Sequence, residues 1–255
     1  RPSAKTANVL ETVKRWIVFP GCNIEVIINN ELPVNIGFLN PKDALNEYLL
    51  TENGKRLTNG REYKVIEKES NGLHFAYAVS KDDFFKDWAL ISCNGYRYRE
   101  EAEEAPIGTC VEGIAVDFST PGFKGQTILA IANATGSTAP RTNVARSALE
   151  DTPQRTSATA KMYTLFAEQV KEEVKRLVVE ENYSLSWAVG QAPFIAAAYT
   201  NHNAPQSDRA AFQASVAQLP LFLVESSGKR EAKSLDDLLK SKELWLIEAP
   251  LLRSV

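Results

Sequence analysis

Two arginines, Arg141 and Arg146, stand five positions apart in a loop of small polar residues, TGSTAPRTNVARSALED, that covers residues 135–151. An apolar run precedes this loop and a long amphipathic segment follows it. A guanidinium offers a fork of donors that matches phosphate oxygens, and the free N–H groups at a helix start favour anions. The pattern is therefore typical either of a loop that presents a cation to an anion or of an ordinary solvated loop.

Other catalytic signatures are missing from the sequence. It contains no G-x-S-x-G nucleophile elbow, no G-x-x-x-x-G-K-[ST] phosphate loop and no H-E-x-x-H zinc motif. The two histidines, His74 and His202, have no metal-ligand spacing, so we expect no metal site and no catalytic histidine. The adjacent carboxylates Glu172 and Glu173 fall on a predicted helix surface, where we expect both to be solvated.

Composition limits the class of protein. The chain has 255 residues, 44% apolar and 24% charged, with a net charge of −3, as in an ordinary globular protein. This charge balance argues against a nucleic-acid-binding surface that covers the whole protein. It does not exclude a local basic patch. No apolar run reaches the roughly 18–20 residues of a membrane span. The three separated cysteines predict free buried thiols and a cytoplasmic location.

Periodicity and turn signals predict a β-rich first half. Residues 15–30 carry two β-rich runs broken at Pro20-Gly21, and residues 41–50 begin with proline and have helical spacing. Asn-Gly turns divide the next segment into strand candidates. We predict strands over residues 63–67, 73–79, 88–98, 110–118 and 126–134. The last is continuously apolar and is therefore expected at the centre of a sheet.

The second half is predicted to be mainly helical. Residues 160–179 place seven apolar side chains on one helical face and charged side chains, Arg176 among them, on the other. Those apolar residues are Met162, Leu165, Phe166, Val170, Val174, Leu177 and Val178. The further predicted elements are helices over 184–199 and 206–218, a strand over 219–224, a helix from the Ser234 cap to Leu239, and a strand over 244–247.

These elements predict an α+β fold with αβα layers. A mixed sheet packed by helices would be followed by a helical stretch and a small αβ segment. We expect three parts: a connector over residues 1–30, a larger αβα part over 31–182, and a helical and small αβ part over 183–255. The chain begins Arg1-Pro2 without methionine, which we interpret as the start of an excised fragment.

The loop also carries a specific pattern. With Asn143, Val144, Arg146 and Leu149 between a strand and a long helix, it resembles the middle domain of the ninety-kilodalton heat-shock chaperones, HtpG-like GHKL ATPases. That family has Asn-Val-Ser-Arg-Glu-x-Leu-Gln at this place. Residues 15–30, 110–118 and 234–247 are also similar to family segments.

The resemblance implies a role for each loop residue. Arg146 would contact the γ-phosphate of ATP, bound with Mg²⁺ in a separate N-terminal nucleotide domain, and stabilise charge during phosphoryl transfer. Asn143 would help to fix the loop, and Arg141 and Glu150 would lie near the nucleotide. Residues 1–30 would connect to that domain. The chain alone would not hydrolyse ATP. It would couple nucleotide state to a client or partner protein, and the full-length protein could form a homodimer.

Three positions depart from the family pattern. Ala145 replaces the usual serine, Ser147 replaces the glutamate, and Glu150 replaces the glutamine. A carboxylate near a γ-phosphate repels it unless Arg141 or Arg146 neutralises that charge or the side chain points away. The resemblance is therefore to a divergent relative.

Two other functions remain open. A transducer domain of a DNA-acting GHKL ATPase would have a similar αβ layer, but it would need a loop lysine and a basic channel. A non-catalytic interaction module would use the loop only to begin the helix, with Thr142 or Asn143 as its cap.

Overall fold

The computed structural model describes residues 9–29, 31–83, 87–93, 105–118, 128–143, 148–181, 183–184, 187–188, 218–220, 222–226 and 228–240. The chain divides into two compact units. The first consists of Arg1–Ser80 with Ile91–Ala158, and the second of Lys81–Leu90 with Thr159–Val255.

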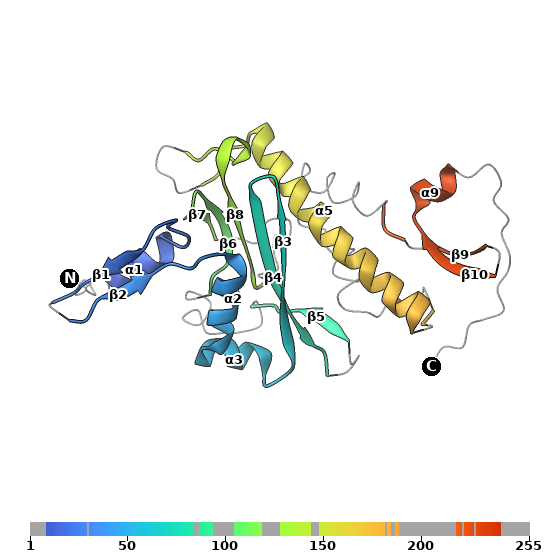
Figure 1. Ribbon diagram of the computed structural model, residues 1–255, viewed down its shortest axis with the longest axis horizontal. Coiled ribbons are helices and arrows are strands. Elements are labelled where there is room, and N and C mark those ends of the chain that lie inside the picture. The colour runs from blue at the N-terminus through green and yellow to red at the C-terminus, as the bar shows by residue number, and fades with distance from the viewer. Residues whose placement is uncertain are drawn as a thin grey trace, which may run out of the picture. The chain divides into compact units, whose positions relative to one another are not determined.

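A mixed sheet forms the centre of the first unit, and its strands follow the order β3-β4-β8-β6-β7 (Figure 1). These strands are β3 (Tyr63–Ser70), β4 (Leu73–Lys81), β8 (Ala130–Ala134), β6 (Gly108–Val111) and β7 (Ile114–Asp117). All neighbours are antiparallel except β6 and β8, which are parallel. The predicted α+β class with a mixed sheet is confirmed, and so is the central position of the strand that ends at Ala134.

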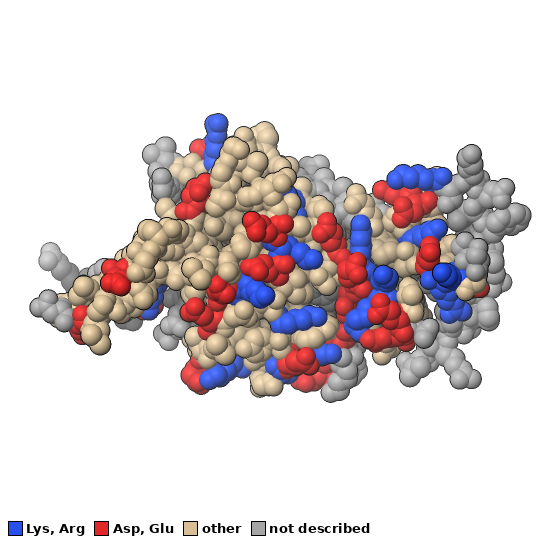
Figure 2. Space-filling view, viewed as in Figure 1, with Lys and Arg blue, Asp and Glu red and all other residues tan. Residues whose placement is uncertain are grey.

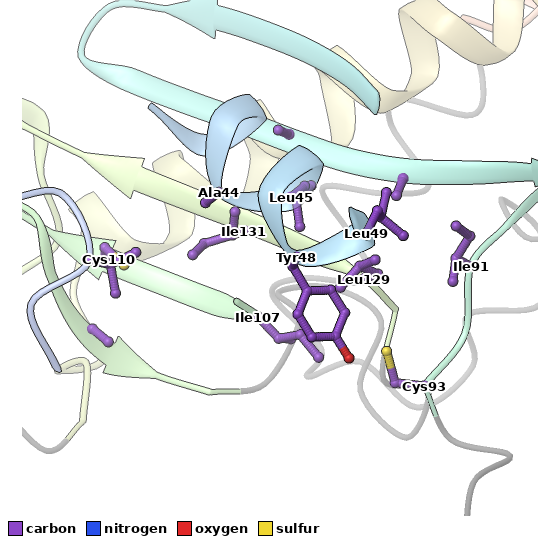
Figure 3. Packing of buried hydrophobic residues seen from close by; sticks show 14 of the residues in the cluster. Ala44, Leu45, Tyr48, Leu49, Ile91, Cys93, Ile107, Cys110, Leu129 and Ile131 are labelled. Atoms are coloured by element: carbon purple, nitrogen blue, oxygen red, sulfur yellow. The ribbon is translucent and has the colours of Figure 1, made fainter. Parts of the chain in front are cut away.

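Helices α2 (Pro41–Leu50) and α3 (Glu52–Thr58) accompany this sheet, and α2 packs against β3 and β8. Asn40 caps α2 by accepting the Asp43 N–H at 2.8 Å, and Pro41 suits the first helical turn. The predicted bounds of this helix are therefore confirmed. Figure 3 shows Leu45, Tyr48 and Leu49 of α2 directed toward Leu129. Burying one such leucine contributes about 1.5–3 kcal/mol.

The predicted strand over residues 110–118 is wrong, because this segment is a hairpin. Strands β6 and β7 pair across a turn in which Glu112 and Gly113 both have positive φ, of 50° and 79°. The Gly113 carbonyl accepts the N–H groups of Val18 and Phe19, each at 2.9 Å. A Cβ at Gly113 would collide with the Phe19 carbonyl, so glycine is required by a contact distant in sequence.

The first of the two predicted β-rich runs in residues 15–30 is also wrong. Helix α1 extends over Val9–Trp16, and Ile17 makes only an isolated bridge to Ile114. A small hairpin follows, formed by β1 (Ile24–Val26) and β2 (Val34–Ile36). Proline at position 20 interrupts the pattern, and Val18 and Phe19 before it are held by their bonds to the Gly113 carbonyl of the β6–β7 turn rather than by pairing with β1.

The second unit contains the longest helix, whose first residues belong to the first unit. Helix α5 covers Pro153–Lys175 and continues as one π-helical turn, η2, over Arg176–Glu180. The helix begins earlier than the predicted residue 160, whereas its seven predicted apolar face residues are all buried. Strand β5 is Trp88–Leu90, and strands β9 (Phe222–Ser226) and β10 (Lys229–Lys233) form an antiparallel pair.

Helix α9, Leu235–Leu239, ends the described part of the second unit. It begins at the predicted Ser234 cap, where a reciprocal capping box with Asp237 is present. Strand β10 was not predicted. The strand predicted over 244–247 lies outside the described residues, as do most of the helices predicted over 184–199 and 206–218.

The cysteines and His74 have ordinary structural environments. Cys93 and Cys110 are buried free thiols, and burial raises the pKa of each to about 12, so neither is a reactive thiolate at neutral pH. Cys22 is exposed, which contradicts the prediction that all three are buried. His74 is half-buried and lies 2.7 Å from a Glu67 carboxylate oxygen, a structural pair. No helix in the described residues has the length and apolar character to cross a membrane.

Candidate functional site

The loop after β8 is closed at its base by backbone pairing. Thr142 and Leu149 form an antiparallel bridge. On either side of this bridge, the Asn143 N–H donates to the Ala148 carbonyl at 3.0 Å, and the Glu150 N–H donates to the Arg141 carbonyl at 2.9 Å. The segment is therefore a short hairpin with paired arms, which the sequence analysis did not anticipate. Its tip, residues 144–147, contains Arg146 and lies outside the described residues.

The first residues of the loop are anchored to two neighbouring turns. The short helix η1, Gly136–Thr138, begins directly after β8. The Gly136 N–H donates to a Glu112 carboxylate oxygen at 2.7 Å, and the Thr135 N–H donates to the Gly72 carbonyl at 2.7 Å. The Thr135 and Gly136 N–H groups at the end of the strand are therefore already occupied. Their partners come from the same chain.

Two supporting residues were missed from the sequence, Glu112 and Asn133. Glu112 holds the loop start through its carboxylate, and the Asn133 side-chain oxygen accepts the Gly113 N–H at 3.0 Å. Asn133 could have been found, because it is the polar residue within the apolar run before the loop and a half-buried amide needs partners. Glu112 had no such signal, since its role depends on strand pairing that brings two turns together.

The loop ends at the start of α5. The Thr152 hydroxyl accepts the Arg155 N–H at 3.3 Å, and the Thr152 carbonyl accepts the Thr156 N–H at 3.1 Å. Thr152 is therefore the N-cap, followed by Pro153 in the first turn. The idea that Thr142 or Asn143 caps this helix is wrong, because both lie in the paired arm of the hairpin.

The charged residues of the hairpin lie on its solvent side. Arg141 and Glu150 are exposed and occupy directly opposite positions beside the Thr142–Leu149 bridge. Side chains opposite each other on an antiparallel pair leave the same face, so Arg141 and Glu150 share one exposed face, although no ion pair joins them. Asn143 is half-buried and next to the tip. The structure thus brings Arg141, Asn143 and Glu150 together.

One carboxylate predicted to lie on the solvated face of α5 is buried in the structure. Glu173 is buried, at 6% exposure, rather than solvated, whereas its neighbour Glu172 is exposed as predicted. Glu173 contacts Arg176, which also contacts Asp87. Among the described residues, no three histidine, cysteine, aspartate or glutamate side chains are grouped to hold a metal ion.

The chain matches no protein-family model, and no curated protein is significantly similar to it.

Proposed function

We propose that this chain is the middle domain of a divergent chaperone-like GHKL ATPase. The hairpin of residues 141–150 supplies Arg146 to the γ-phosphate of Mg²⁺-ATP bound in a separate N-terminal domain. The chain then couples nucleotide state to the binding of a client or partner protein. The observation that carries the proposal is the Asn-Val-x-Arg loop, placed between a central strand and the long helix α5.

The hairpin geometry supports this role. A residue that stabilises developing charge must be held in place before the reaction, because an ordered donor costs no reorganisation. Here the arms on both sides of the tip are paired through the Asn143 and Glu150 N–H groups. The loop start is held by Glu112, and the loop end is fixed by the helix cap at Thr152. The two segments that flank residues 144–147 in the sequence are therefore both anchored.

The strand register also bears on the negative charge of Glu150. A carboxylate near ATP would oppose phosphate binding, and the family pattern has a neutral residue at this position. Arg141 and Glu150 leave the same face of the hairpin, so we propose that Arg141 turns toward Glu150 and offsets its charge when the nucleotide is bound. Arg141 then acts on charge balance rather than in phosphoryl transfer, which we assign to Arg146.

Surface properties favour a protein partner over DNA. Ile27, Leu32 and Leu39 are large apolar residues with 62%, 87% and 92% exposure, and we propose that they contribute contacts to a client protein. In the face drawn in Figure 2, acidic and basic side chains are interspersed over the described surface. The free cysteines of the described residues support a cytoplasmic location.

Amide hydrogen exchange tests whether the hairpin senses the γ-phosphate. The full-length protein, which combines this chain with its nucleotide domain, is compared with ADP and with a non-hydrolysable ATP analogue. Amides of residues 141–150 are expected to exchange more slowly with the analogue, because contact between Arg146 and the γ-phosphate orders the hairpin. Helix α3 serves as the internal control and should be unchanged. Equal exchange of residues 141–150 with both nucleotides would contradict the proposal.

A further inference from the structure

A second group of charged residues surrounds Arg176 in the second unit. Arg176 Nη2 donates to Asp87 Oδ1 at 2.7 Å and to Glu173 Oε1 at 2.5 Å, and Nε donates to Glu173 Oε2 at 3.2 Å. Nη1 pairs with Glu181. One guanidinium therefore meets three carboxylates, and full ionisation would leave this cluster with excess negative charge.

The excess charge is unfavourable because two of the carboxylates are buried. Asp87 and Glu173 are each 6% exposed, and the uncompensated burial of a carboxylate costs several kcal/mol. Both carboxylate oxygens of Glu173 accept hydrogen bonds from Arg176. Asp87 accepts only from the Arg176 Nη2 nitrogen, which also donates to Glu173. The Trp88 N–H also donates to Asp87 Oδ1, at 2.8 Å, so the N–H groups of Arg176 and Trp88 both donate to the same carboxylate oxygen. The Asp87 side chain is also in hydrogen-bonding contact with Glu173.

The π-helical turn begins at the same arginine. In an α-helix, side chains three and four positions apart are neighbours, which explains the contact between Glu173 and Arg176. Glu181 is five positions beyond Arg176, and the turn over Arg176–Glu180 brings it to the guanidinium. The Glu181 N–H also donates to the Arg176 carbonyl, at 2.9 Å. The end of α5 and the residues around Asp87 are therefore joined through one side chain.

We propose that Asp87 holds a proton in contact with Glu173 and that, with Arg176, these carboxyl groups form a proton-controlled latch between the residues around Asp87 and the end of α5. With the proton bound, Asp87 donates to Glu173 and the two carboxyl groups stay together. Loss of the proton places two negative charges side by side and loosens the latch. This inference is independent of the proposed nucleotide role.

The direction of the pH effect follows from Asp87. Burial raises its pKa, the adjacent Glu173 carboxylate adds to this effect, and the Trp88 N–H and Arg176 oppose it. An acid whose pKa is higher in the folded state contributes stability below its unfolded pKa. It loses that contribution as pH rises through the folded value. The latch is therefore closed in acid and loosens as pH rises.

Other charged groups nearby do not account for this effect. Strand β10 packs against the π-helical turn and carries Lys229, Arg230, Glu231 and Lys233. Among the described residues none of these forms an ion pair with the cluster, and Lys233 pairs with Glu231 at 3.8 Å. Lys81, from the segment that precedes Asp87, lies over the Trp88 ring at 4.7 Å. The cluster itself supplies the groups that can exchange a proton with Asp87.

The test is hydrogen exchange of peptides covering residues 81–90 and 173–183 between pH 4.5 and 8, corrected for intrinsic rates. In the wild type, protection should fall as pH rises. Asp87→Asn keeps the oxygen that accepts from Arg176 and Trp88 but cannot ionise. In this variant the protection of the amides against exchange should vary little with pH. At pH 8 it should exceed the protection in the wild type about tenfold.

Glu172→Gln is the matched control, because it removes an exposed charge next to the cluster and should behave as the wild type does. Circular dichroism checks that each variant folds, and Glu173→Gln is the second variant if Asp87→Asn does not fold. A pH-independent wild type, or the same pH dependence in the neutral variant and the wild type, overturns the latch. Loss of the pH dependence in Glu172→Gln also overturns the latch, because the effect would then arise from the total charge of the region rather than from Asp87.

Discussion

Under the proposed function, we expect Arg146→Ala to lower the kcat for ATP hydrolysis of the full-length protein about 10³-fold. An arginine that stabilises charge in phosphoryl transfer contributes roughly 10³–10⁵ in rate, and a 10³-fold loss corresponds to about 4 kcal/mol of transition-state stabilisation. The KM for ATP should change much less, because the contact strengthens as charge develops. Steady-state phosphate release, measured over a range of ATP concentrations, separates the two effects.

Two further variants define what the arginine supplies. Arg146→Lys keeps the charge but loses the fork of donors, so it should recover only part of the rate. Arg230→Ala removes an exposed arginine of β10, far from the hairpin in sequence, and should leave kcat unchanged. Wild-type turnover in Arg146→Ala would remove Arg146 from the mechanism and favour a non-catalytic interaction module.

Arg176→Met lowers the free energy of unfolding by about 3 kcal/mol at neutral pH. Removing one partner of a buried ion pair costs about 3–5 kcal/mol, because the remaining charge is left buried and uncompensated. Here Asp87 and Glu173 would both lose their cation, although proton uptake by Asp87 and the partial exposure of Arg176, at 32%, moderate the loss. Methionine keeps most of the volume and has a similar helix propensity. Urea denaturation gives the difference directly.

The matched comparison is Lys55→Met, which also removes the cation of a pair three positions apart. Lys55 lies 3.1 Å from Glu52, but their side chains are 60% and 82% exposed. Such exposed pairs contribute little, so the loss should stay below about 0.5 kcal/mol. Equal losses in the two variants would mean that burial of Asp87 and Glu173 has no energetic consequence, and the latch would lose its physical basis.

Local signals predicted the fold well. Helix α2 was found to the residue because Asn40-Pro41 and its apolar spacing are local. The position of β8 followed from its continuous apolar run. The β6–β7 hairpin was missed because Gly113 is required by the Phe19 carbonyl rather than by its neighbours in the sequence. Strand β10, KREAK, has no apolar alternation and is defined by its pairing with β9.

The candidate site was predictable in composition but not in geometry. The sequence pointed to Arg141, Asn143, Arg146 and Glu150, yet it did not predict that Thr142 pairs with Leu149. The same limit applies to Arg176, which was placed on the charged face of a helix, and to Asp87, which is 89 positions away and was not singled out from the sequence. Burial depends on tertiary packing, so charge spacing alone could not identify this pair.

The most direct test of the account is a structure of the full-length protein with Mg²⁺ and a non-hydrolysable ATP analogue. The predicted result is that the Arg146 guanidinium donates to γ-phosphate oxygens at about 2.7–2.9 Å. A guanidinium paired instead with carboxylates of its own domain, with no open path to the nucleotide, would contradict the proposed function.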